Sequence, residues 1–158
     1  MELLPHSEFS KLHIRQFLPP DAFTEDSSGL EQSVLGFNRC RHYFMAKSGW
    51  LLFHYLDSPP VVLAGVDASL LDSDLPVGVA ERVLAACVPG VHARMQVRDV
   101  IAAFGSPELT SHDAGESGFY RFRVGERWPY RVGCHFRSAD GLAAFWIVRE
   151  DFFVEDEA

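Results

Sequence analysis

The stretch that decides the fold is Tyr130-Arg131-Val132-Gly133-Cys134-His135-Phe136-Arg137. Apolar and polar side chains alternate along it, which is the period-two pattern of a strand with one buried face. The even-numbered residues are all apolar, so we expect them to face a core. Arg131, His135 and Arg137 carry the opposite phase and are expected to point away from that core.

Two flanking segments extend this strand into a sheet. Residues 119–124 alternate in the same way, with Arg121 and Arg123 on the polar phase. Residues 142–149 are apolar on both phases, which predicts a central strand, or one whose second face a partner covers. With a turn at 138–141, the sequence predicts an antiparallel meander over 119–149. Within it, Phe136 and Trp146 are expected to be buried.

The N-terminal half has a similar order of elements. A short helix is expected over about 30–38, followed by strands over 43–47, 50–56 and 61–66. Ser48-Gly49 fits a hairpin turn, because glycine supplies the positive φ that such turns require.

Two helices are expected between the two groups of strands. Asp74 can cap a helix that continues to Cys87, and a second helix runs from about Arg94 to Phe104. Gly105 followed by Pro107 is a good signal for its end.

The predicted order is therefore one helix, three strands, two helices and three strands. We expect a single α+β domain over 1–158, in which two three-stranded antiparallel meanders carry helices packed on one face. An internal duplication is a hypothesis that this order suggests. Residues 1–28 are expected to form an irregular leader, and residues 150–158 an acidic tail.

The segment Val97-Arg98-Asp99-Val100-Ile101-Ala102-Ala103-Phe104-Gly105-Ser106-Pro107-Glu108, with the meander after it, resembles the repeat unit of the SmpA/BamE and β-lactamase-inhibitor-like group. The resemblance covers residues 95–149. It implies a sheet with helices on one face and a second face free to grip a protein, and it carries over no catalytic residue. Unlike the outer-membrane members, the chain has no lipobox cysteine near its start.

Composition excludes some classes of function. The formal net charge is −8, which disfavours nucleic-acid binding because phosphate contacts need a basic surface. The first residues lack the basic and apolar regions of a secretion signal, and no apolar run is long enough to span a membrane. Three widely spaced cysteines favour a reducing compartment. We therefore expect a cytoplasmic protein.

No recognised catalytic or metal motif is present. Cys134-His135 together with Cys40-x-His42 could supply zinc ligands, but neighbours on a strand point to opposite faces. A nucleophilic pair such as Cys40 with His54 would need an orienting third group, and the sequence selects none. We expect no catalytic residue, cofactor or metal.

Charge is distributed unevenly along the chain. Residues 57–81 contain five acids and no base, whereas residues 119–149 are rich in arginine. Both can be solvated faces, or they can be docking surfaces for a basic partner and for an anionic group, respectively. The candidate partner contacts are Asp67, Asp72, Asp74 and Glu81, the arginines Arg121, Arg123, Arg131 and Arg137, and the aromatic anchors Trp50, Tyr55 and Trp128.

Two classes of function fit these observations. The first is a non-enzymatic protein-binding domain, for example a bacterial immunity-type inhibitor that binds and neutralises a toxin. The basic surface in this complex would belong to the toxin. The alternative is a small enzyme or ligand-binding domain with a pocket between helices and sheet. Whether the chain forms a homodimer stays open.

Overall fold

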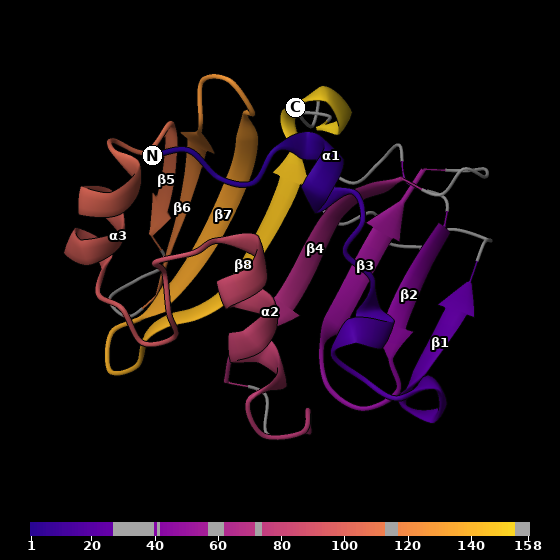
Figure 1. Cartoon of the computed structure of the whole chain (residues 1–158). Coiled ribbons are helices and arrows are strands. Elements are labelled where there is room, and N and C mark those ends of the chain that lie inside the picture. Colours follow the sequence, from indigo (N-terminus) through magenta and orange to yellow (C-terminus); the bar gives the residue numbers. More distant parts are fainter. Residues whose placement is uncertain (27–39, 41, 57–61, 72–73, 113–116, 154–158) are drawn as a thin grey trace.

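The computed structural model describes residues 1–26, 40, 42–56, 62–71, 74–112 and 117–153. These residues form an α+β fold around one antiparallel sheet of eight strands, in the order β1-β2-β3-β4-β8-β7-β6-β5 (Figure 1). The strands are β1 Phe23–Asp26, β2 His42–Ala46, β3 Leu51–Tyr55, β4 Leu63–Ser69, β5 Leu109–His112, β6 Ser117–Val124, β7 Tyr130–Arg137 and β8 Gly141–Arg149.

The sheet consists of two runs of four sequential strands that meet in its centre. β1 to β4 form one run and β5 to β8 the other, and β4 pairs with β8 from Gly65↔Val148 to Ser69↔Ala144. The predicted three-stranded meanders are therefore too small, because each run has one more strand at the sheet edge. Both added strands, β1 and β5, have only four residues and a largely polar sequence, which weakens the alternation signal.

The helices are α1 His6–Phe9, α2 Val79–Cys87 and α3 Val97–Phe104. α2 begins later than predicted, because Gly78 at its start has a left-handed φ of +82° and Asp74 lies in the preceding loop. α3 ends at Gly105, as the sequence predicts. The helix expected over about 30–38 lies outside the described residues. No helix among the described residues is long and apolar enough to cross a membrane.

The prediction of an irregular leader over 1–28 needs correction. Its described part contains α1, the 3₁₀ turns Ile14–Gln16 and Pro20–Ala22, and β1. Phe9 and Ile14 are completely buried, and the hydroxyl of Tyr130 donates a hydrogen bond to the carbonyl oxygen of Leu4 at 2.6 Å. Apolar residues spaced irregularly can thus anchor a segment that has no clear period of its own.

The three helices lie on one face of the sheet (Figure 1). The main core lies between them and that face, and includes the even-numbered residues of β7, as predicted. We call the opposite side of the sheet the outer face. β8 is central, as predicted: Ile147 faces the main core, whereas Trp146 and Val148 form a second, smaller cluster on the outer face. Phe136 and Trp146 are both buried.

A candidate binding site on the outer face

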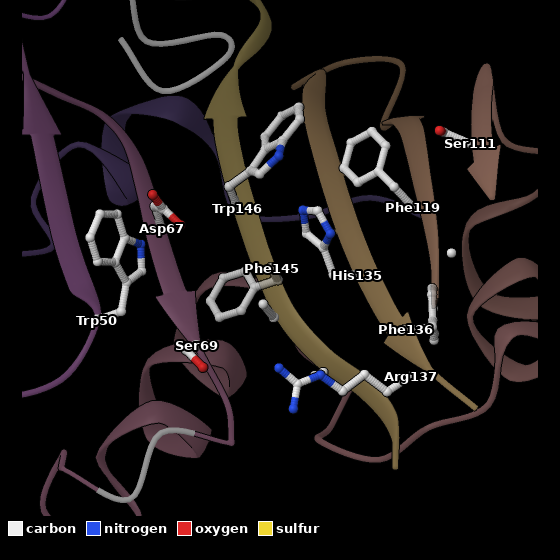
Figure 2. A pocket seen from close by; sticks show the side chains of 13 residues that line it. Trp50, Asp67, Ser69, Ser111, Phe119, His135, Phe136, Arg137, Phe145 and Trp146 are labelled. Carbon is white, nitrogen blue, oxygen red and sulfur yellow. The ribbon is translucent and has the colours of Figure 1, made fainter. Parts of the chain in front are cut away.

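The outer face contains a hollow of about 780 Å³. Its walls come from strands of both runs, so the site exists only because β4 and β8 pair. The side chains that define it are those of Trp50, Asp67, Ser69, His135, Arg137 and Trp146 (Figure 2).

The hollow forms where small side chains lie between large ones. The backbone N–H of Ser69 donates to the carbonyl oxygen of Trp50 at 3.0 Å, and Ser69 is followed across the sheet by Ala144 and His135. Ser69 and Ala144 leave space that the flanking Trp50 and His135 do not fill. The central seam of the sheet is therefore the floor of the hollow, and the two rings are its sides.

Trp50 and Asp67 form one side of the hollow. The Trp50 side chain is 45 % exposed, and its indole N–H donates a hydrogen bond to the Asp67 carboxylate. Asp67 is itself only 9 % exposed. Burial raises the pKa of Asp67 to about 6, against the opposing effect of the hydrogen bond from Trp50. The carboxylate thereby fixes the direction of an exposed aromatic ring.

Trp146 forms the wall next to Asp67, and Gly133 allows it to lie flat. A Cβ at Gly133 would lie 2.1 Å from Cε2 of Trp146, so no larger residue fits beneath the indole. The ring stacks on Phe119 at 6.2 Å and on Phe153 at 6.1 Å, measured between centroids. This packing keeps a large aromatic surface on the side of the sheet that the helices leave uncovered.

His135 and Arg137 complete the other side. The His135 ring packs 4.8 Å from Phe119, and the loss of solvent around it lowers its pKa, so the imidazole is neutral at pH 7. Arg137 is exposed and forms no ion pair with a described residue. Figure 2 shows its side chain extended along the edge of the hollow, on the side of Ser69.

Serine, histidine and aspartate line the hollow, but they do not form a catalytic triad. Ala144 lies between Ser69 and His135, so those two residues are on strands about 10 Å apart. Phe119 separates Ser111 from His135 in the same way. The described hydrogen bond of Asp67 comes from Trp50, not from His135. No nucleophile and base are within hydrogen-bond reach of each other here.

Two of the three cysteines, Cys87 and Cys134, are buried in the core. Cys134 lies on the core face and His135 on the outer face, as strand geometry predicts. Burial raises the pKa of the Cys87 and Cys134 thiols to about 12, and it lowers the pKa of His54 to about 3. No group of three metal-ligating side chains occurs among the described residues.

Three of the four candidate arginines belong to an ion-pair network rather than to a free docking face. Glu108 bridges Arg121 at 2.7 Å and Arg131 at 3.0 Å, and Glu150 bridges Arg131 at 3.2 Å. Glu150 also accepts a hydrogen bond from Nη2 of Arg123 at 3.1 Å. We call these five residues the arginine network.

The four acidic candidates do not share one surface. Asp67 lies in the hollow on the outer face, whereas Glu81 is exposed on α2, beyond the other face of the sheet. Asp74 is exposed in the loop before α2, and Asp72 lies outside the described residues. The acidic segment over 57–81 as a docking element for a basic partner stays a prediction, and Asp67 and Glu81 would contribute to it from opposite faces of the sheet.

The three aromatic candidates have different surroundings. Tyr55 is 1 % exposed and donates a hydrogen bond to the carbonyl oxygen of Leu12, so its prediction as an exposed anchor is wrong. Trp128 is half-buried in the β6–β7 loop, 5.7 Å from His6. Trp50 alone of the three lines the hollow. Sequence reasoning missed Ser69 and Ala144, whose small size carries no signal until β4 is paired with β8.

Comparisons of the chain with protein-family models, with curated proteins and with solved structures found no match.

Proposed function

We propose that this chain is a non-enzymatic protein-binding domain whose partner docks on the outer face. The observation that carries the proposal is the hollow, with the half-exposed Trp50 held at its side by a buried carboxylate. Tryptophan in a preorganised position is a frequent hot spot in protein interfaces. The hollow spans two strand runs and is large enough to receive side chains of a partner.

An immunity-type inhibitor in the bacterial cytoplasm is the particular role that we propose. The net charge of −8 would accelerate encounter with a basic toxin. Cys40, Cys87 and Cys134 form no disulfide with one another, which fits a reducing compartment. The proposed SmpA/BamE-like architecture fits as well, since it leaves one sheet face free to grip a protein.

A small-ligand-binding domain is the second candidate. The volume of about 780 Å³ falls within the range of small-molecule pockets, and the walls combine aromatic side chains with polar ones. The sequence predicts such a pocket between helices and sheet, whereas this hollow lies on the outer face.

The test is capture from native host extract followed by mapping of the contact. The wild-type chain is expected to retain a protein, and hydrogen exchange of the complex should show protection in β4, β7 and β8. Trp50→Ala should reduce retention at least tenfold (on the order of a hot-spot residue). Glu81→Lys, on the opposite side of the molecule, should not. Retention of no protein, equal retention by Trp50→Ala, or protection confined to α2 and α3 would contradict the proposal.

A further inference from the structure

The Asp67 carboxylate lines the hollow, and the part of the chain that the structure describes places no basic side chain against it. It is 9 % exposed, and no salt bridge joins it to a basic side chain among the described residues. The hydrogen bond that it accepts comes from a neutral donor, the Trp50 indole. A buried carboxylate in this position is stabilised when a cation comes within hydrogen-bond distance.

The walls around this carboxylate suit a cation as well. Trp50 presents an exposed ring, and Trp146 and Phe119 stack beside it on the same face. Aromatic faces attract cations through the ring quadrupole, most strongly for tryptophan. A planar guanidinium can stack on an indole while its N–H groups donate to a carboxylate, which an ammonium group does less well.

We propose that the hollow receives an arginine side chain of a protein partner, with the guanidinium against the Trp50 ring and bonded to Asp67. This inference rests on the proposed protein-binding function and names the chemistry of the partner. The overall charge of −8 favours the approach of a basic segment.

The other charged and titratable groups around the hollow are consistent with an arginine guest. His135 on β7 is neutral at pH 7, because the loss of solvent around its ring lowers its pKa. Arg137 is the one like charge that lines the hollow among the described residues, and it lies on the side of Ser69 rather than of Asp67 (Figure 2). An acidic guest would instead bring two carboxylates together at Asp67, which is unfavourable in a buried site.

The test uses three blocked tripeptides, acetyl-Gly-Xaa-Gly-amide, with arginine, citrulline or glutamate as the central residue. Citrulline keeps the size and planarity of arginine and removes its charge. Each peptide is titrated into the folded chain, and the indole N–H resonances of the ¹⁵N-labelled tryptophans are followed by NMR. The arginine peptide should shift the Trp50 resonance saturably, with at least about fivefold higher affinity than the citrulline peptide.

Matched variants separate the carboxylate from general electrostatics. Asp67→Asn keeps an oxygen that accepts the Trp50 N–H but removes the charge. It should lower the affinity for the arginine peptide about tenfold. Glu81→Gln removes the same charge from the far side of α2 and should change affinity less than twofold. Arg137→Gln should strengthen binding, because it removes a like charge from the edge of the hollow.

Equal affinity for the arginine and citrulline peptides, tighter binding of the glutamate peptide, or equal weakening by Asp67→Asn and Glu81→Gln would each overturn the inference. The proposed function is tested separately. If the full partner still protects the outer face but the arginine peptide does not shift Trp50, the docking face is retained and the arginine guest is rejected. If no partner is retained either, both proposals fail.

Discussion

The outer face contains two charged regions that differ in how their carboxylates are neutralised. In the arginine network, Glu108 and Glu150 each contact two guanidinium groups. In the hollow, Asp67 is bonded to a neutral indole. Trp146 lies between the two regions, packed on Phe119 on one side and on Phe153 on the other. The same kinds of residue thus build a closed structural network in one place and an open site in the other.

The two regions respond to pH in opposite directions. Hydrogen bonding from Arg123 lowers the pKa of Glu150, whereas burial raises the pKa of Asp67. A lowered pKa means that the charged form is favoured by folding, and a raised one means that folding opposes it. The comparison indicates that the network stabilises the protein and that the hollow costs stability at neutral pH.

The largest expected effect comes from a change that disturbs both regions together. Gly133→Ala would place a methyl group 2.1 Å from Cε2 of Trp146, which forces the indole out of its position. We expect a loss of about 3 kcal/mol in the free energy of unfolding, measured by urea denaturation. Trp146→Leu in the same chain should remove most of this additional cost in a double-mutant cycle. If the free-energy changes of the two substitutions are additive, the close approach of Trp146 is not the reason that residue 133 must be glycine.

The next effect distinguishes the hollow from the network. Burial raises the pKa of Asp67 from its ordinary 3.8 to about 6, so its ionisation begins to oppose folding above pH 3.8 and does so fully above about pH 6. Two pKa units correspond to about 3 kcal/mol, and the Asn amide also has to be buried, so we expect Asp67→Asn to stabilise the protein by about 2 kcal/mol at pH 8. The stabilisation by Asp67→Asn should disappear below pH 4, where the Asp67 carboxyl is protonated in both the folded and the unfolded chain. A destabilised Asn variant at pH 8 would mean that the charge is compensated after all.

The smallest effect tests the network. Glu150→Gln removes the partner of Arg123 and Arg131, and we expect a loss of about 1 kcal/mol at pH 7, since the pairs are partly exposed. The lowered pKa of Glu150 places this contribution above 4.5, and it should fade as the pH drops through the folded-state pKa. The measurement is the difference in free energy of unfolding between variant and parent, obtained by denaturation at pH 7 and again below the folded-state pKa of Glu150. A difference that does not change with pH would mean that the loss of stability comes from packing and not from the ion pairs.

The strands with clear alternation could be predicted, and the site could not. β7 and the core face of β6 follow directly from side-chain period, and α3 from its apolar stripe and Gly105. The hollow depends on Ser69 of β4 lying beside Ala144 of β8, and that pairing has no local signal. Asp67 and Glu81, near in sequence, are on opposite sides because Asp67 points to the outer face of β4 and α2 covers the other face. The burial of Tyr55 has no signal in the sequence, because its hydroxyl donates to the carbonyl oxygen of Leu12 in a segment that shows no period.

The pairing of β4 with β8 also has a kinetic consequence. Every other strand pair among the described residues joins neighbours along the chain, whereas Gly65 must find Val148 across α2, α3 and three further strands. Closing so long a loop has a large entropic cost, and topologies rich in distant contacts fold slowly. The two runs can each assemble from local hairpins before the seam between them closes. We therefore expect the hollow, which lies on that seam, to be among the last features of the protein to form.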